Sequence, residues 1–159
     1  SYYREIGVPV TVLRFFSVYG ERERPDKFYH RLIKAILEDT EVPFYEGSEH
    51  HIRSYSYISD IIDGCILVLN NHDKVIGEIF NLGTDKTATT GDGIRVVEDI
   101  VGKKAKLRTL PRRQGDQFET SANIEKIRRV LGYNPKMSLK EGLDAQVAWY
   151  RDKIHKKIK

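Results

Sequence analysis

The chain has 159 residues, of which 40% are hydrophobic and 31% charged, and these values are ordinary for one globular domain. Its single cysteine, Cys65, excludes a disulfide framework within the chain and favours a reducing compartment. Without a run of about 18 apolar residues or a signal peptide, we expect a cytoplasmic protein with no membrane partner. Much of the net charge of +4 lies in the tail at 153–159, and no nucleic-acid-binding motif accompanies it.

The first part of the chain predicts a helix end, a strand and a second helix. Residues 1–7 read as the last turns of a helix that stops at Gly7. The almost continuous apolar run at 8–16 predicts a buried parallel strand. Asp26 is expected to cap a helix that continues to about Asp39, since apolar residues recur there at helical spacing. Extended segments are then expected at 41–45 and 52–58.

The rest of the chain alternates helices with strands. Asn123 is expected to cap one helix, and Ser138 to open the last one in a capping box. Gly102 and Gly132 are expected to end helices. The first helix of this part carries a predicted core stripe of Ile61, Cys65, Ile66 and Leu69. The predicted elements are helix 59–70, strand 78–82, helix 90–101, strand 105–110, helix 124–131 and helix 139–150. Such alternation indicates the α/β class.

Arg53 is the strongest candidate for a binding residue. It lies at a strand position in an otherwise apolar and aromatic segment, with Tyr55 and Tyr57 beside it. An arginine directed inward there requires an anion, and the guanidinium fork suits phosphate oxygens. The alternative is a surface arginine on an edge strand.

A second candidate is the loop that follows the predicted strand at 105–110. It contains Arg112, Arg113, Gly115 and Asp116. A basic pair, a glycine and an acid can grip a ribose diphosphate, because the arginine takes the phosphate and the carboxylate accepts from ribose hydroxyls. Solvated loop charges explain the same pattern.

Two longer runs, at 13–26 and 52–64, resemble the carboxyl-terminal half of the NAD-dependent sugar-nucleotide epimerases and dehydratases, the extended short-chain dehydrogenase/reductase family. The second run contains Arg53, Tyr57, Ile58 and Asp60 at the family's spacing, with Ser54 in place of the usual aspartate. Residues 120–135 also fit the family pattern. The resemblance implies one residual Rossmann strand at the end of a Rossmann portion (1–26) and a small mixed α/β substrate-binding domain (27–159).

The resemblance also implies roles for individual residues. Arg53 would hold the nucleotide diphosphate, and Ser17 would place a hydroxyl beside it. The segment around Phe16 and Ser17 would lie along the nicotinamide. The residues expected to bind the substrate are Ser17, Phe44, Tyr45, Arg53, Arg113 and Asp116, with Phe44 and Tyr45 around the uracil and Arg113 and Asp116 at the uridine.

The run Arg22-Glu23-Arg24-Pro25-Asp26 resembles the glucuronate branch, so the implied activity is a UDP-glucose or UDP-glucuronate 4-epimerase using NAD. The same frame would serve a dehydratase or reductase. Neither a glycine-rich dinucleotide loop nor a Tyr-x-x-x-Lys pair occurs in the chain. We therefore expect the NAD-binding half and the catalytic residues to lie outside it, the chain alone to be inactive and without NAD, and a homodimer only in the intact enzyme. A free-standing nucleotide-sugar-binding module and a basic nucleic-acid-binding domain are the alternatives.

No metal site is expected. The pair His50-His51 stands in a polar loop without convergent ligands. The glycines around Asp92 lack the third glycine and the preceding strand of a nucleotide fingerprint, so we interpret them as the start of a helix.

Overall fold

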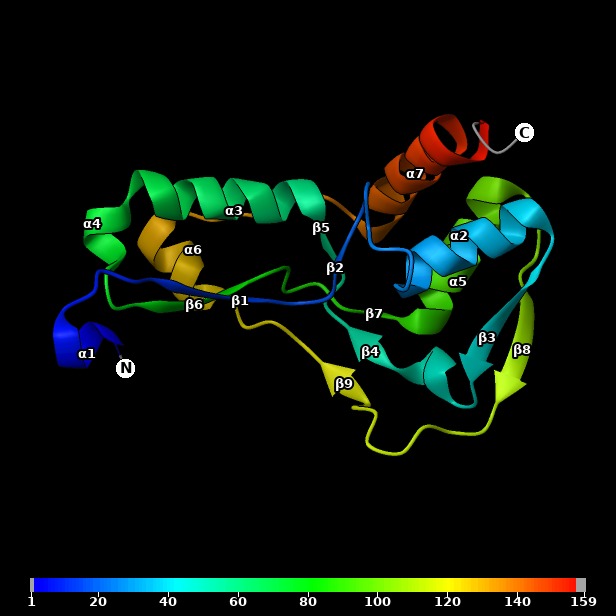
Figure 1. Ribbon diagram of the computed structural model, residues 1–159, viewed down its shortest axis with the longest axis horizontal. Coiled ribbons are helices and arrows are strands. Elements are labelled where there is room, and N and C mark those ends of the chain that lie inside the picture. Colours follow the sequence, from blue (N-terminus) through cyan, green and yellow to red (C-terminus); the bar gives the residue numbers. More distant parts are fainter. Residues whose placement is uncertain (1, 157–159) are drawn as a thin grey trace.

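The structure is a computed structural model that describes residues 2–156. It is elongated, with two lobes joined by short strands (Figure 1). The helices are α1 (Tyr2–Ile6), α2 (Phe28–Glu38), α3 (Ile58–Asn70), α4 (His72–Val75), α5 (Thr90–Val101), α6 (Glu125–Leu131) and α7 (Leu139–Tyr150), with a 3₁₀ turn η1 (Ser48–His50) and a π-helical turn η2 (Arg151–His155). The strands are β1 (Val12–Phe15), β2 (Val18–Tyr19), β3 (Glu41–Tyr45), β4 (Ile52–Arg53), β5 (Ser56–Tyr57), β6 (Ile79–Leu82), β7 (Ala88–Thr89), β8 (Lys106–Leu110) and β9 (Glu119–Thr120).

One lobe is built on two parallel strands, β1 and β6, which pair with Val12 opposite Ile79. Helices α3 and α6 lie together along these strands (Figure 1). Phe80 and Leu82 of β6 are fully buried in a cluster that also contains Ile61 of α3 and Ile127 of α6. The strands thus bury one face of their short sheet beneath the helices.

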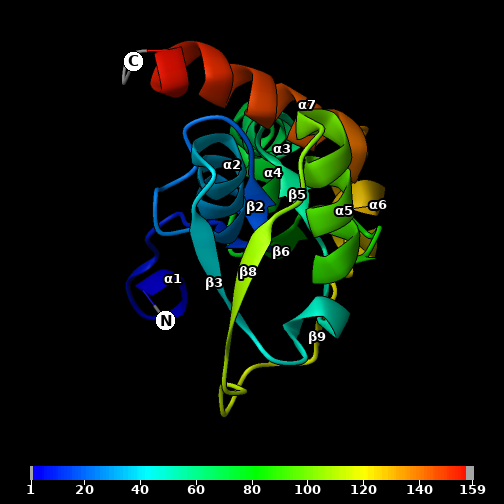
Figure 2. The same cartoon turned by 90° about the vertical axis from the view of Figure 1, so that its right-hand side faces the viewer.

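The other lobe packs α2, α5 and α7 against the parallel pair β3 and β8. Its cluster is larger and includes Leu32 and Ile33 of α2, Val97 of α5 and Leu143 of α7, all fully buried. Figure 2 shows the long β8–β9 connection extending away from this core.

The two lobes meet at short strands in the middle of the molecule. Strand β2 runs parallel to β5, while β4 pairs antiparallel with β7 and parallel with β9. Gly20 follows β2 with φ of +136°, a conformation that a side chain rarely adopts. A Cβ there would lie 2.6 Å from the Cγ2 atom of Ile58. Only glycine therefore lets this loop approach the start of α3.

The α/β class is confirmed, and so are several local signals. Thr89 and Asp92 form a capping box at the start of α5, and Ser138 forms one with Glu141 at α7. Gly102 and Gly132 take the left-handed conformation at the ends of α5 and α6. The glycines around Asp92 do belong to a helix start. Asn123 accepts a hydrogen bond from the amide of Glu125 at 3.0 Å, although the helix begins at Glu125 rather than 124.

Several predicted elements were wrong in detail. The strand expected at 52–58 is two separate two-residue strands, because β4 and β5 pair with different neighbours and α3 begins at Ile58. Asp26 does not cap α2; it pairs with Arg24 at 3.1 Å. Instead, the carboxylate of Glu23 accepts from the amide of His30 in the first turn of α2, at 2.9 Å.

The strand expected at 8–16 is shorter and not buried. It spans Val12–Phe15, and the side chains of Val8, Val10 and Val12 are exposed because no other described element packs on their face. The predicted core stripe of α3 was wrong in part, although Cys65 packs half-buried on the core cluster as part of it. Ile61, Gly64 and Val68 are buried, whereas Ile66 and Leu69 face solvent.

The division at residue 26 stays a prediction. The cluster beneath α3 and α6 contains Leu13 and Val18 together with residues from 61–82 and 122–133. Of the tail at 153–159, residues 157–159 lie outside the described part of the chain, as does Ser1. Between residues 2 and 156, no helix combines the length and apolarity needed to cross a membrane.

Candidate functional site

A cavity of about 460 Å³ lies where β1 leaves one lobe and α2 begins in the other. Two of the predicted site residues, Ser17 and Arg53, line it. The lining residues are Phe15, Ser17, Val18, Tyr19, Glu23, Lys27, Phe28, Tyr29, Arg53 and Tyr55. Aromatic rings, one carboxylate and two basic groups therefore enclose a space that would accept a polar ligand with a planar part.

Arg53 is held by backbone carbonyl oxygens. Its Nη1 donates to the carbonyl of Ile52 at 2.7 Å and to that of Phe118 at 3.0 Å. Its Nη2 donates to the carbonyl of Gln117 at 2.5 Å. The side chain is half-buried at the cavity, and it contacts the segment before β9 rather than a carboxylate. A guanidinium has five N–H donors, so these contacts leave it capacity for an anion.

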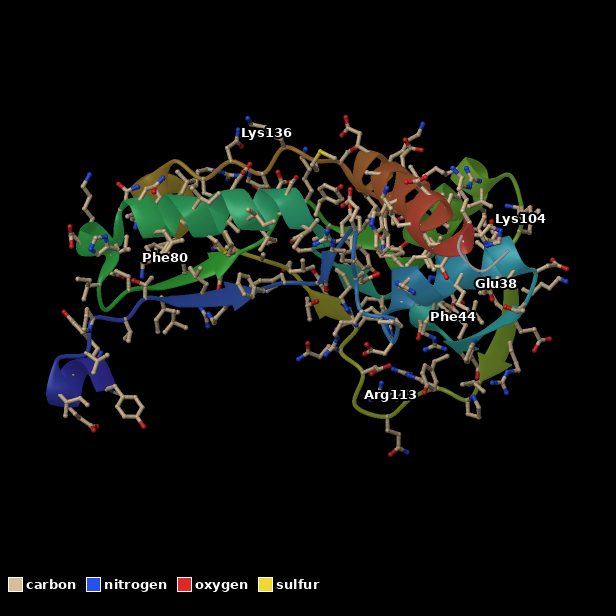
Figure 3. All side chains as sticks on the ribbon, turned by 45° about the horizontal axis from the view of Figure 1, so that its top comes forward. Glu38, Phe44, Phe80, Lys104, Arg113 and Lys136 are labelled. Carbon is tan, nitrogen blue, oxygen red and sulfur yellow. The ribbon has the colours of Figure 1, made fainter. Side chains whose placement is uncertain are left out.

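The loop that Arg53 holds carries two more predicted site residues. The Nε atom of Arg113 lies 3.7 Å from an Oδ1 of Asp116, and its guanidinium lies 6.0 Å from the centre of the Tyr45 ring. Figure 3 shows Arg113 on the β8–β9 connection, at the edge of the molecule. Tyr45, Arg113 and Asp116 thus form one group, which Arg53 joins through the backbone of the same loop.

Ser17 and Phe16 point to different surroundings. Ser17 is exposed at the cavity and has a φ of +23°, at the edge of the region that favours glycine. Its carbonyl accepts from the amide of Ser56 at 3.2 Å, which fixes the kink between β1 and β2. Phe16 packs against the cluster beneath α3. Phe15, by contrast, is 55% exposed and lines the cavity.

Phe44 stands apart from the exposed members of the site. It is buried in the core of the α2–α5–α7 lobe, with its ring centre 6.0 Å from that of Phe28. Phe28 in turn lines the cavity. Phe44 therefore supports the cavity wall through Phe28, while its neighbour Tyr45 reaches the surface under Arg113.

The segment after Arg53 is built from small hydroxyls and one buried carboxylate. Ser54, where the family has aspartate, accepts from the amide of Ala122 at 3.0 Å. Ser56 accepts from the amide of Thr84 at 3.1 Å. Asp60 accepts from the amides of Lys136 and Met137 at 3.0 and 3.1 Å. Serine thus provides an acceptor that anchors the chain after β9, and the replacement leaves Arg53 in position.

Burial changes the proton affinity of several groups at the cavity. It raises the pKa of Glu23, although hydrogen bonds from Gln146 and the His30 amide oppose the shift. It also raises the pKa values of Tyr19 and Tyr55, so both remain neutral hydroxyls at neutral pH. The hydroxyl of Tyr55 lies 3.0 Å from that of Thr90.

Several cavity residues were not found from the sequence. Tyr19 is the last residue of β2. Glu23 and Lys27 come from the loop between β2 and α2, whose path no periodic pattern reveals. The acidic residue Glu21 also has a specific contact: both its carboxylate oxygens lie 2.6–2.7 Å from the hydroxyl of Tyr57. The sequence signal that could have indicated this contact was Tyr57, a buried tyrosine three residues before Asp60.

The histidine pair does not gather metal ligands. His50 lies 3.6 Å from Glu49, and His51 stacks edge-on against Phe118. Within residues 2–156, no group of three or more histidine, cysteine, aspartate or glutamate side chains could hold a metal ion.

Comparison with known proteins decides the family. The profile of the NAD dependent epimerase/dehydratase family matches residues 1–83, which is just over half of the chain. The chain belongs to this family. The resemblance read from the runs at 13–26 and 52–64 is therefore confirmed for this epimerase/dehydratase chain.

Each of the individual relatives matches nearly all of this chain, but only about half of its own length is covered. The uncharacterized UDP-glucose epimerase YtcB of Bacillus subtilis is 38% identical over 148 residues, which cover 93% of this chain and 46% of YtcB. The crystal structure of the UDP-glucuronic acid 4-epimerase from Bacillus cereus with UDP-glucuronic acid and NAD matches with a TM-score of 0.88 and 37% identity, over 94% of this chain and 48% of that one. DesIV, a dTDP-glucose 4,6-dehydratase from Streptomyces venezuelae, matches with a TM-score of 0.87 and 29% identity, over 96% and 47%. This epimerase/dehydratase chain thus spans about half the length of the relatives it matches.

Proposed function

We propose that this chain is the nucleotide-sugar-binding part of an NAD-dependent 4-epimerase that acts on UDP-glucose or UDP-glucuronate. The observation that carries the proposal is the cavity shared by Ser17 and Arg53, together with the loop that Arg53 holds. The relatives named UDP-glucose epimerase and UDP-glucuronic acid 4-epimerase support the substrate class.

The substrate would be bound mainly by its diphosphate. Arg53 enters the cavity from β4, and Lys27 adds a second cation from the start of α2. Ser17 offers a hydroxyl at the same wall. Fixed cations aligned on a diphosphate hold it firmly while the sugar remains free to turn. A 4-epimerase requires this freedom, because hydride leaves one face of the sugar carbon C4 and must return to the opposite face.

The uridine would lie towards the β8–β9 loop. Arg113 and Asp116 present a guanidinium and a carboxylate there, and the Tyr45 ring offers a flat apolar surface beside them. A carboxylate accepts from ribose hydroxyls, while the ring stacks on the base. In this proposal Phe44 acts from the core, by supporting the cavity wall through Phe28.

The chemistry that bound NAD would supply in the intact enzyme is reversible hydride acceptance from the sugar. The residues that would lie beside its nicotinamide are Ser17 and Phe16. Ser17 fits such a place, because its side chain is exposed on the wall next to the bare face of β1. Phe16 would act only through its packing. We propose that residues 1–26 end the cofactor-binding portion and that 27–159 bind the substrate.

The catalytic tyrosine and lysine are proposed to lie outside the chain. The chain alone would then bind UDP-sugar weakly, hold no NAD and catalyse no epimerisation, and its natural partner would be the NAD-binding half, with a homodimer formed only by the intact enzyme. The dehydratase alternative keeps one specific support, the match to DesIV. A cytoplasmic location stays a prediction.

The first test is calorimetric titration of UDP into the chain. We expect saturable binding that the Arg53→Ala substitution weakens at least about tenfold, since a charge-assisted contact to phosphate contributes about 1.5–3 kcal/mol. Arg129→Ala is the matched control, because Arg129 is an exposed arginine of α6 outside the cavity. Equal UDP affinity in the two variants would contradict the role of Arg53, and epimerisation or NAD reduction by the chain alone would contradict the division of labour.

A further inference from the structure

A second cavity, of about 570 Å³, lies between α2, β3 and the end of α7. Figure 1 shows these three elements side by side in the α2–α5–α7 lobe, and Figure 2 shows them from the side. The lining residues are Pro25, His30, Arg31, Lys34, Ala35, Thr40, Glu41, Val42, Pro43, Tyr150 and Ile154. None of them lines the cavity of Ser17 and Arg53, so the two spaces are distinct.

His30, one of the lining residues, brings a mostly buried imidazole ring to the wall of this cavity. His30 is only 8% exposed, and its Nδ1 atom is buried and makes no hydrogen bond to the protein. Its ring lies edge-on to the buried ring of Tyr150, with 5.1 Å between centres. Because that nitrogen has almost no accessible surface, a ligand in the cavity would touch the accessible part of the His30 ring and not this atom, and the ring would report on occupancy.

The rim of the cavity carries positive charge that the protein does not neutralise. Arg31 and Lys34 stand three residues apart on α2 and therefore share one side of the helix. Across residues 2–156, neither side chain forms an ion pair or hydrogen bond with a carboxylate. The acidic lining residue, Glu41, is 3.9 Å from the guanidinium of Arg108 on β8. The positive charge of Arg31 and Lys34 at the rim would therefore favour binding of an anion.

The remaining walls are apolar. Ala35 and Val42 are buried, and Pro43 and Ile154 complete the surface against which a ligand would pack. A ligand that suits the whole cavity therefore needs an anionic group and an apolar body.

We propose that this cavity is a second binding site, for a small organic phosphate. The phosphate is bound by Arg31 and Lys34, and the body packs against Ala35, Val42, Tyr150 and the ring of His30. Guanidinium and ammonium groups one turn apart suit phosphate oxygens. The proposal does not depend on the UDP-sugar site.

The test uses phenyl phosphate as the probe and the imidazole resonances of His30 as the readout. We expect these resonances to shift saturably during titration, and the double variant Arg31→Ala/Lys34→Ala to raise the Kd at least about tenfold. Inorganic phosphate alone should bind more weakly, because it cannot pack against the apolar wall. Lys34→Ala alone, which alters one exposed side chain, gives the same direction of change should the double variant be unstable.

The matched control is Arg129→Ala/Lys140→Ala, which removes two exposed cations far from the lining of this cavity. Its affinity for phenyl phosphate should equal that of the unaltered chain, and so should that of Arg53→Ala. An unmoved His30 signal, a shift that never saturates, or the same loss of affinity in both double variants would overturn the proposal.

Discussion

Glu23 links three parts of the molecule through one carboxylate oxygen. Its Oε2 accepts from the amide of His30 at 2.9 Å and from the side-chain amide of Gln146 on α7 at 2.8 Å. The same residue lines the cavity of Ser17 and Arg53. A buried acceptor that joins the start of α2 to α7 is well placed to couple the shape of the cavity to the packing of both helices.

The titration of Glu23 should make stability fall as the pH rises. Burial raises its pKa above the ordinary value of 4.5, so the folded chain holds this proton to higher pH than the unfolded chain does. The favourable contribution is complete below pH 4.5 and is lost as the pH rises through the folded pKa. A tenfold difference in proton affinity between the folded and unfolded chain corresponds to about 1.4 kcal/mol of stability. In Glu23→Gln this dependence on pH should vanish.

The measurement is the free energy of unfolding in urea at intervals from about pH 4 to pH 8, for the unaltered chain and Glu23→Gln. Their difference should change in favour of the variant as the pH rises. Glu46→Gln, which removes one exposed carboxylate from the loop after β3, controls for the change in overall charge. A difference that stays constant across this range would contradict a raised pKa at Glu23.

At the scale of the element, the start of α5 depends on a reciprocal cap. The hydroxyl of Thr89 accepts from the amide of Asp92 at 3.0 Å, and the carboxylate of Asp92 accepts from the amide of Thr89 at 2.9 Å. Thr89→Ala removes one half of this pair and should lower the free energy of unfolding by about 1 kcal/mol. Urea denaturation measures it. Thr87→Ala, at an exposed threonine two residues earlier, should have almost no effect, and equal losses would refute the role of the cap.

Elements were predictable where their signals are local. Both capping boxes and the glycines that end α5 and α6 depend on residues within one helical turn, so sequence spacing was sufficient. The split of 52–58 into β4 and β5 was not predictable, because it depends on pairing with β2, β7 and β9, which come from distant parts of the chain. The register between strands that lie far apart in the sequence cannot be predicted from a short sequence window.

The candidate site, like the helices and strands, was predictable from the sequence only in part. Arg53 and Ser17 were found from the sequence and share one cavity. The contacts of Arg53 were not foreseeable, because they go to the main-chain carbonyls of residues 117 and 118. Every residue has such a carbonyl, so the sequence does not indicate which ones accept. Lys27 was missed for another reason: it belongs to a loop whose path is set by the tight approach of Gly20 to Ile58.

At the scale of the whole molecule, the candidate site lies at the joint of two separately packed lobes. Its residues come from β1, β2, α2 and β4, so each lobe contributes one wall. The joint is held by few main-chain pairs, chiefly β2 with β5 and β4 with β9. The side chain of Arg53 adds hydrogen bonds across β4 and the segment before β9. Its carbonyl contacts therefore stabilise the joint at the place where a diphosphate is proposed to bind.

The lobe of β1 and α3 leaves much apolar surface in solvent. On α3, Ile62, Ile66 and Leu69 recur at helical spacing on an exposed face, and Leu69 is 70% exposed. Val12 and Phe15 of β1 are also exposed. Contiguous apolar patches of this kind drive association in water. We therefore expect the isolated chain to self-associate through this face, in assemblies distinct from the homodimer proposed for the intact enzyme. The double variant Ile66→Lys/Leu69→Lys should shift the population towards the monomer.

Sedimentation velocity over a range of concentrations measures this shift. Leu107→Lys is the control, because Leu107 is an exposed apolar residue of β8 in the other lobe. It should leave the weight-average mass unchanged, since it lies outside the α3 face. Far-ultraviolet circular dichroism of all three proteins checks that the helices remain. If Leu107→Lys dispersed the assemblies as well as the α3 variant, the association would be a general property of the apolar surface. An unaltered chain that sedimented as a monomer would show that the exposed face of α3 is too small to hold a second molecule.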